Sequence, residues 1–500
     1  MTINNDGQYK LVRGLGLLAA VSVIVGNVIG TGVFLKARVM TCNVGTPGWV
    51  IAAWIAAGLL SLAGALTYAE LTAMKPRAGA EYVFLRDAYG RVSSFLYGWM
   101  QMFIAKPGSQ AAVGMAFAIG LNDFLGNGAL ENVVFMETTI AGYPFELSLV
   151  TIVAIMVIII FTTLNCASVA ISGQIATALT FVKIALIAFV AIGAFLWVTG
   201  DFAHFSMVES GGTCTGVNES VRYGAAGYSF AAGFAAAMLG ALWGYDGWNN
   251  LTFVAGEVKE PGRNIPLAII GSTVLIIIVY VFAHFAYFYA LDPTTIASVS
   301  DKSSVAKVVV SMFFGGDPAS FAVGLAVSLF TVGLMLSSLG TLHTSILSGS
   351  RVGYAMAGDG LMFRIFGRLS VTGVPIPALL FQGFLACLLA LTGSFDTLTN
   401  YVVFGSWIFY ALVTSSIFLY RRKYPDAERP YKAFGYPVAP AVFLLVVAWL
   451  LITTIISDTL QSFIGIGLIV LGLPVYYYLI SRNNGGGGPT NGGVADGEHG

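Results

Sequence analysis

Charged side chains are scarce in this chain of 500 residues. Only 10% of the residues are Asp, Glu, Lys or Arg, whereas 57% are hydrophobic. A soluble domain typically contains about 25% charged residues, so this chain has too little polar surface to fold as a soluble globule. The 24 basic and 24 acidic residues also cancel, and no basic face is available to bind nucleic acid.

Motifs for catalysis are missing as well. No HExxH, G-x-S-x-G, Walker A or CxxC motif stands in a suitable context. Neither His284 nor His343 has a second ligand at the spacing that a metal site requires. These absences argue against an enzyme, and we expect no metal and no cofactor.

Long apolar runs are what the sequence does contain. About 20 residues of helix cross the hydrocarbon core of a bilayer. The runs are continuous and do not alternate with a period of two, which favours helices over a β-barrel. We therefore predict an all-α membrane protein with twelve transmembrane helices, at about 14–35, 47–72, 93–121, 148–166, 172–198, 228–256, 265–291, 318–350, 376–393, 396–420, 438–457 and 460–481.

The distribution of Lys and Arg predicts the orientation. With the N-terminus inside, 17 of the 24 fall in cytoplasmic segments, five in outside loops and two, Lys106 and Lys183, within spans. Cytoplasmic loops of membrane proteins are enriched in Lys and Arg. We expect a multi-pass protein of the cell (cytoplasmic) membrane, with both termini in the cytoplasm.

The segments between and beyond the spans carry further expectations. Residues 1–13 form a cytoplasmic N-terminus, and 79–95 have the apolar spacing of a helix at the cytoplasmic surface. Residues 482–500, rich in Gly and Asn, are predicted to be a disordered tail. Cys42 and Cys214 both fall in outside loops, where an oxidising compartment permits a disulfide, which we state as a hypothesis.

Two spans contain glycines and polar residues near their middles. The first reads VGNVIGTGVF at 25–34, and the sixth reads LWGYDGWNNLTF at 242–253. Each glycine inside a helix costs roughly 0.5–1 kcal/mol relative to alanine. Interrupted helices at matching positions of two halves indicate an inverted-repeat transporter with its site at the membrane midplane.

A broken helix exposes unpaired backbone groups. The end of one half-helix offers free carbonyls and the start of the next offers free amides, each with about half a charge. Amides near Thr31 to Phe34 are suited to a carboxylate, and carbonyls near Val28, Trp243 and Gly244 to an ammonium. Together they match an α-amino acid.

At these residues the chain resembles a known family. GNVIGTGVF and LWGYDGWNNLTFVAGEVKEPGRNIPLAI resemble the first and sixth helices of the L-type amino acid transporters, within the amino acid, polyamine and organocation superfamily. The resemblance continues in PRAGAEYVFLRDAYG, FIAKPGSQ, TLNCASV, SSLGTLHTSILSGSRVGYAMAGDG and RRKYPDAERPYKAFGYPVAP. It covers the chain to about residue 480.

The resemblance implies a LeuT-like 5+5 inverted repeat. The first repeat would span 14–198 and the second 228–420, with helices 11 and 12 at 438–481 outside it. It also implies sodium-independent exchange of amino acids by alternating access. The substrate-binding residues carried over are Val28, Ile29, Gly30, Thr31, Gly32, Trp243 as an aromatic gate, Gly244, Tyr245, Asp246 and Gly247.

Two departures from the family pattern change what is expected. Animal members carry a cysteine after the third helix that bonds to a heavy-chain glycoprotein, but residues 122–147 contain no cysteine. We therefore expect no disulfide-linked heavy-chain subunit, as in bacterial members. In the tenth helix, Ser406 stands where some animal members have asparagine, so the resemblance implies that Ser406 is a candidate residue of the side-chain pocket.

Four charged residues require individual interpretation. Lys183 lies mid-span, where an ammonium usually marks a functional site. The resemblance implies that it occupies the place at which sodium-coupled relatives hold a cation. Lys106 precedes Pro107, so it either reaches carbonyls that the proline frees or has a functional role. Asp246 either caps the second half of the sixth helix, which we favour, or binds a cationic side chain. Glu257 is expected to form an ion pair in a gate or loop.

These features predict a sodium-independent amino acid exchanger, with small neutral L-amino acids as the expected substrates. A proton-coupled amino acid or amine symporter of the same superfamily remains the alternative. A membrane receptor or channel is more remote, because no ligand domain or repeated pore-lining segment is visible.

Overall fold

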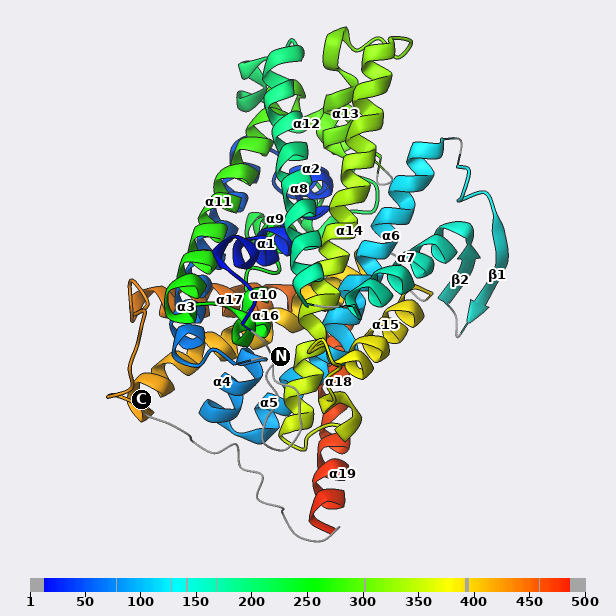
Figure 1. Cartoon of the computed structure of the whole chain (residues 1–500). Coiled ribbons are helices and arrows are strands. Elements are labelled where there is room, and N and C mark those ends of the chain that lie inside the picture. The colour runs from blue at the N-terminus through cyan, green and yellow to red at the C-terminus, as the bar shows by residue number, and fades with distance from the viewer. Residues whose placement is uncertain are drawn as a thin grey trace.

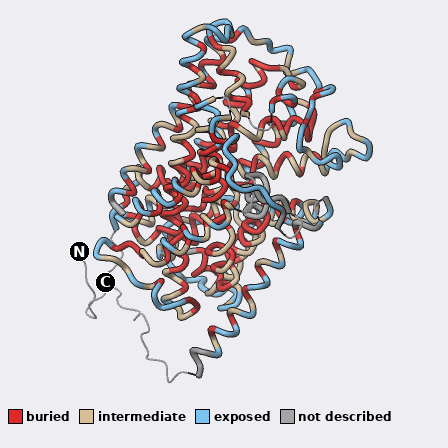
Figure 2. The backbone as a smooth tube through the Cα atoms, turned by 90° about the vertical axis from the view of Figure 1, so that its right-hand side faces the viewer, coloured by how far each residue is buried: buried red, intermediate tan, exposed pale blue. Residues whose placement is uncertain are grey.

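The computed structural model describes residues 13–77, 79–126, 128–140, 143–167, 169–300, 303–391, 395–457 and 459–485, and these are mostly helical (Figure 1). Within these ranges, seven helical segments are long and apolar enough to cross a membrane, and three shorter apolar helices accompany them. Buried residues concentrate through the middle of the molecule (Figure 2). The expectation of an all-α, multi-span protein is confirmed.

Each predicted apolar run contains helix within the described residues. In the first half the helices are α1 (Leu17–Val28), α2 (Gly32–Val44), α3 (Pro47–Met74), α5 (Arg91–Met100), the π-helix η1 (Gln101–Ala105), α6 (Lys106–Leu125), α7 (Leu149–Asn165) and α8 (Val169–Trp197). After these come α9 (Phe230–Tyr245), α10 (Asn250–Phe253), η4 (Ala255–Glu257), α11 (Pro261–Ala290), α14 (Phe321–Gly358), α15 (Ile376–Ala390), α16 (Phe395–Lys423), α17 (Val438–Ser457), α18 (Thr459–Val470) and α19 (Gly472–Gly485).

The first and sixth spans are interrupted where the glycines predict. The first stops at Val28 and resumes at Gly32, and the sixth stops at Tyr245 and resumes at Asn250. Gly247 lies in the second interruption with φ of +106°, and a Cβ there would clash with the side-chain nitrogen of Asn27. Only glycine satisfies both the backbone conformation and this close approach.

The loops on the predicted outer side contain structure that the sequence pattern does not indicate. An antiparallel hairpin of β1 (Val134–Ile140) and β2 (Tyr143–Ser148) joins α6 to α7. The longer loops hold the 3₁₀ turns η2 (Phe202–Ser206) and η3 (Glu219–Val221) and the short helices α12 (Pro293–Ser298) and α13 (Val305–Ser311), of which α12 and α13 lie at the top of Figure 1.

The hypothesised disulfide between Cys42 and Cys214 is present, with the two Cα atoms 5.8 Å apart. It joins the end of α2 to the loop between α8 and α9. The backbone N–H groups of Tyr223 and Glu209 donate to the carbonyls of Cys42 and Gly45. The disulfide and these bonds fix the loop to the last turn of α2.

The predicted surface helix at 79–95 is corrected in two respects. The helix α4 (Ala80–Tyr89) ends at Tyr89, and α5 starts at Arg91, so Gly90 separates two helices. Tyr82, Phe84 and Leu85 of α4 have no exposed surface. The helix therefore packs into the helical bundle, because its apolar residues are covered by other helices.

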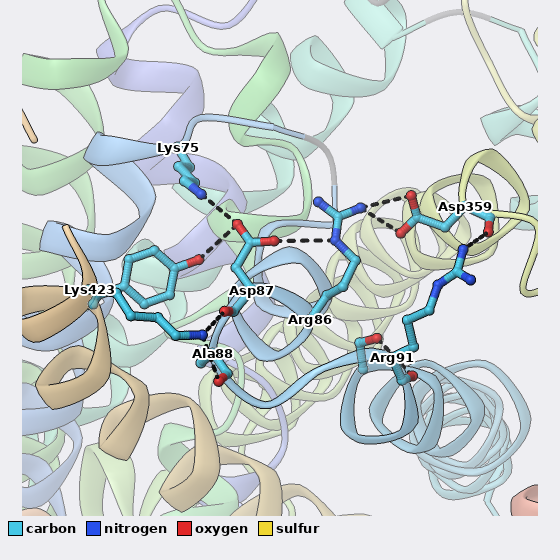
Figure 3. A network of polar contacts seen from close by, with 9 residues as sticks. Lys75, Arg86, Asp87, Ala88, Arg91, Asp359 and Lys423 are labelled. Atoms are coloured by element: carbon cyan, nitrogen blue, oxygen red, sulfur yellow. Dashed lines mark hydrogen bonds and ion pairs between the residues drawn. The ribbon is translucent and has the colours of Figure 1, made fainter. Parts of the chain in front are cut away.

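A network of charges holds α4 to its neighbours (Figure 3). Lys75 donates to Asp87 at 2.5 Å, and Arg86 pairs with Asp359 at the end of α14 at 2.6 Å. Lys423 at the end of α16 donates to the carbonyl of Asp87 at 3.0 Å. Although partial burial opposes it, the contacts with Lys75 and Arg86 lower the pKa of Asp87 below its ordinary value.

The predicted disordered tail is corrected at its start. Helix α19 continues to Gly485, so residues 482–485 are helical. The remainder, 486–500, lies outside the described residues, as does most of the predicted cytoplasmic N-terminus at 1–13.

Candidate functional site

Two adjoining cavities lie at the helix interruptions. The larger, about 30 Å³, is lined by Asn27, Val28, Gly30, Thr31, Gly32, Ser109, Val113, Trp243, Asp246 and Thr341. The smaller, about 10 Å³, is lined by Asn27, Gln101, Ala105, Lys106, Ser109, Asp246, Asn249, Asn250, Phe253, Ser406 and Tyr410. Asn27, Ser109 and Asp246 belong to both, so they form the boundary between the cavities.

The start of α2 presents backbone donors at the larger cavity. The first helical bonds of α2 are those from the N–H groups of Phe34 and Leu35 to the carbonyl of Thr31. The N–H groups of Gly32 and Val33 come before them, and the first amides of a helix have no partner within it. With the partial positive charge of the helix start, they are suited to an anion.

The two interruptions approach each other closely at Gly32. A Cβ on this residue would stand 2.7 Å from the Cα of Gly244 and 3.3 Å from the Trp243 ring. Contacts this short with backbone require glycine. The donors of the first interruption and the carbonyls of the second are therefore held within one small space.

Lys183 of α8 occupies the carbonyl end of α1. Its Nζ donates to the carbonyls of Gly26 at 2.5 Å and Ile29 at 2.6 Å, and to the Thr341 hydroxyl at 2.6 Å. The side chain has no exposed surface. Its three hydrogen-bond partners among the described residues are all uncharged oxygen atoms, which makes the ammonium a fixed cation at the negative end of a half-helix.

Tyr280 of α11 is absent from the predicted site but connects the two interruptions. Its hydroxyl lies 2.9 Å from the carbonyl of Val28 and 3.0 Å from that of Gly244. These are two of the carbonyls expected to bind an ammonium, and each keeps a second lone pair. The available sequence signal is weak, because Tyr280 is one of several aromatic residues in an apolar run.

Polar side chains from several helices meet around the smaller cavity. Asp246 accepts a hydrogen bond from the Tyr410 hydroxyl at 2.8 Å. Asn249 donates to Glu81 of α4 at 2.6 Å, and Tyr97 also donates to Glu81. Since α4 lies between spans yet Glu81 is fully buried, desolvation raises the pKa of this carboxyl to about 8.

The geometry corrects two interpretations of charged residues. Lys106 does not reach carbonyls freed by Pro107, because its Nζ donates to the side chains of Asn250 and Ser348. The favoured capping role of Asp246 is also wrong, since Asn249 is the residue that precedes α10, and the Asp246 carboxylate accepts from Tyr410.

The inner end of the sixth helix is closed by a buried ion pair. Arg351 of α14 donates to Glu257 at 3.1 Å, and neither side chain has more than 1% exposed surface. Leu15 and Glu257 are joined by a backbone hydrogen bond of 2.9 Å. The expected ion pair of Glu257 is confirmed, and it links the first, sixth and eighth spans.

The structure brings together most of the predicted site residues. Those that line the larger cavity are Val28, Gly30, Thr31, Gly32, Trp243 and Asp246. Ser406 lines the smaller one. The predicted residues that line neither are Ile29, Gly244, Tyr245 and Gly247, with Lys183 behind the first interruption. The Tyr245 side chain points away, donating to the carbonyl of Trp54 at 3.1 Å.

Comparisons with known proteins agree with this architecture. The family described as amino acid permease matches residues 15–480. The chain is 28% identical over 473 residues to the b(0,+)-type amino acid transporter 1 of Mus musculus. The aligned region covers 94% of this chain and 88% of the relative. It is 29% identical over 485 residues to the large neutral amino acids transporter small subunit 2 of Mus musculus, covering 95% and 82%.

Proposed function

Because this chain belongs to the amino acid permease family and is a multi-pass membrane protein that transports amino acids, we propose that it is a sodium-independent exchanger. The substrates are neutral L-amino acids, and transport proceeds by alternating access. The observation that carries this proposal is the meeting of two interrupted helices at one cavity, which offers both amide donors and carbonyl acceptors.

The cavity matches the common part of an amino acid. The substrate carboxylate binds the N–H groups of Gly32 and Val33 at the start of α2, where the helix dipole favours an anion. Its ammonium binds the remaining lone pair of the Val28 carbonyl, which lines the cavity. The Tyr280 hydroxyl lies 2.9 Å from this carbonyl and 3.0 Å from that of Gly244, which does not line the cavity. Trp243 lines the cavity and covers the bound ligand.

Lys183 supports independence from sodium. Its ammonium already contacts two carbonyls and one hydroxyl that bring α1, α8 and α14 together. Oxygen atoms arranged in this way are also ligands for a small cation. A covalently attached cation at this place removes the need for a transported one.

Alternating access requires two groups of helices to move relative to each other. We propose that residues 14–198 and 228–420 form the two repeats, with 438–481 outside them, and that spans one, two, six and seven rock against the rest. The Glu257 to Arg351 ion pair and the Lys106 to Asn250 hydrogen bond cross between these groups. Opening to the cytoplasm would break both contacts.

The protein acts in the cell membrane with both termini in the cytoplasm, as the distribution of Lys and Arg supports. It needs no disulfide-linked heavy-chain subunit. The support for this is the sequence of residues 122–147, which contains no cysteine.

Exchange is tested with purified protein in liposomes in sodium-free buffer. Uptake of labelled alanine and leucine is measured with and without neutral amino acids inside, and protein-free liposomes are the control. Uptake that requires internal amino acid and does not change when sodium is added supports the exchanger. Equal uptake into empty liposomes that rises with an inward proton gradient refutes it and favours the symporter.

A further inference from the structure

Helix α4 is attached to helices that stay in place during the proposed rocking. Arg86 pairs with Asp359 at the end of α14 at 2.6 Å, and Lys423 at the end of α16 donates to the carbonyl of Asp87 at 3.0 Å (Figure 3). Helices α14 and α16 form spans eight and ten, which lie outside the rocking group. Since α4 is bound to these spans, it belongs to the stationary side of the protein.

One carboxyl group of α4 reaches across to the rocking group. Glu81 accepts a hydrogen bond from Asn249 at 2.6 Å, and Asn249 lies in the interruption of the sixth span. On the stationary side, Tyr97 of α5 donates to the other carboxyl oxygen of Glu81. The N–H group of Gly79 also donates to the carbonyl of Phe253, the last residue of α10, at 3.1 Å. Opening of the sixth span toward the cytoplasm therefore breaks the contact between Glu81 and Asn249.

The surroundings of Glu81 contain a positive group and a second acid. The Glu81 side chain has no exposed surface. The charged or titratable groups that interact with it are Tyr68 of α3, Tyr97 of α5, Lys106 of α6, Asp246 of the second interruption and Tyr410 of α16. Helix α14, which also touches α4, carries Arg351 and Asp359, and these are paired with Glu257 and Arg86. Among the described residues, two carboxyl groups thus face one ammonium.

This arrangement favours a proton on one of the two carboxyl groups. With both ionised, the cluster would carry a net negative charge, which is costly where water is excluded. Burial raises the pKa of the Glu81 carboxyl to about 8, because desolvation outweighs the hydrogen bond from Asn249 and the attraction of Lys106. The Tyr97 hydroxyl can accept as well as donate, so it also serves the protonated form. Glu81 therefore holds a proton at neutral pH while the inner side is closed.

Opening changes the affinity of this carboxyl group for the proton. Once the sixth span moves away, water reaches Glu81 and its pKa returns toward the ordinary value of 4.5. Between this value and about 8, the closed form then binds one proton more than the open form. Each pH unit in this range shifts the equilibrium toward the open form by up to about tenfold. The proton leaves to the cytoplasm and returns from it, so it is not transported.

We infer that Glu81 is a proton-binding site that controls the inner side of the transport pathway: a proton on its carboxyl group holds the sixth span against α4, and loss of this proton to the cytoplasm permits opening. The inference rests on the proposed function, because it requires alternating access. It adds a dependence on cytoplasmic pH to an exchanger that carries no proton.

The first test measures exchange as a function of pH. Uptake of labelled alanine into liposomes preloaded with alanine is followed in sodium-free buffer, with the same pH inside and outside. While the closed form predominates, the rate follows the fraction of open protein, so we expect it to rise about tenfold or more from about pH 6 to about pH 8 and then to level off. A rate that stays constant or falls over this range would overturn the inference.

The second test changes the carboxyl group itself. Glu81→Gln keeps an acceptor for Asn249 but has no proton to lose, so it should exchange at the low-pH rate of the wild-type protein at every pH. Glu81→Ala removes the contact and should exchange at the high-pH rate throughout. Glu137→Gln removes an exposed carboxyl group from the outer hairpin, and this matched control should keep the wild-type rise. A rise that persists in Glu81→Gln would place the proton elsewhere and overturn the inference.

A spectroscopic readout separates the inference from the proposed function. Infrared difference spectra of the purified protein detect the C=O absorption of a protonated carboxyl group. We expect a band that is lost as the pH passes about 8 and that is absent from Glu81→Gln. If the band is present but the wild-type protein exchanges no amino acid, the proposed function fails and the proton site stands. If exchange occurs without the rise with pH, or if Glu81→Gln keeps the band, only the proton site fails. The wild-type pH profile and band remain decisive should a Glu81 variant not fold.

Discussion

Replacing Lys183 with methionine removes the fixed cation and keeps the length of the side chain. The carbonyls of Gly26 and Ile29 then lose the donor that lies 2.5 and 2.6 Å away. A buried polar group left unsatisfied costs about 1–3 kcal/mol, so two carbonyls give at most about 2–6 kcal/mol. The Thr341 hydroxyl remains 3.5 Å from both carbonyls and the Ser337 hydroxyl 3.5 Å from that of Ile29, which lowers this cost. Methionine also relieves the cost of burying an ammonium, so we expect the lower end of this range, about 2 kcal/mol.

A loss of this size leaves the protein folded, because folded proteins are stable by about 5–15 kcal/mol. The lost hydrogen bonds lie at the end of α1, which lines the larger cavity. We therefore expect the rate of amino acid exchange to drop by about 30-fold, the equivalent of about 2 kcal/mol. The assays are thermal unfolding of the purified protein and exchange of labelled serine and alanine in sodium-free liposomes.

The matched control is Phe181→Met on the same helix, since that side chain is 60% exposed on the outer face of the bundle. It should unfold and exchange like the wild-type protein. Wild-type exchange by Lys183→Met without sodium would refute the proposed role of the ammonium.

Other features of the structure lead to further predictions. Gly32→Ala places a Cβ 2.7 Å from the Cα of Gly244, so exchange should fall at least tenfold while the protein still inserts in the membrane, as measured by uptake normalised to purified protein. Changing Cys42 and Cys214 together to serine should lower the free energy of unfolding by about 2–4 kcal/mol, measured by chemical denaturation. The pKa of Glu81 is raised from 4.5 to about 8 in the folded state. Between these pH values the folded protein binds a proton that the unfolded chain has lost, so the free energy of unfolding should fall as pH rises from 4.5 to about 8 and then level off. Glu81→Gln should flatten this part of the profile of unfolding temperature against pH.

Each of these predictions has a control in the same chain. Gly48→Ala adds a methyl group where no atom lies within 4 Å, and it should exchange normally. Cys387→Ser alters a cysteine outside the disulfide, so it should not reproduce the loss in stability. Glu137→Gln removes an exposed carboxyl and should keep the wild-type pH profile. If any control matches its test variant, the stated physical reason is wrong.

The sequence by itself determined the class of protein and the placement of its spans. A membrane requires long apolar helices whose backbone groups are paired internally, and this requirement is local, so it is visible in consecutive residues. The interruptions at 28–32 and 245–250 were equally visible, because glycine and polar residues are unfavourable inside an apolar helix and so mark the place where it breaks. Lys183 stood out for the same reason.

Only the tertiary structure decided which groups meet. Lys183 contacts carbonyls more than 150 residues away, Tyr280 joins both interruptions, and Lys106 points to Asn250 and not to its own helix. A helix that is apolar on all sides has no amphipathic face, so its sequence does not specify its rotation about its own axis. That rotation directs Tyr245 away from the cavities and Ser406 toward one of them, and it is set by packing among helices distant in the chain.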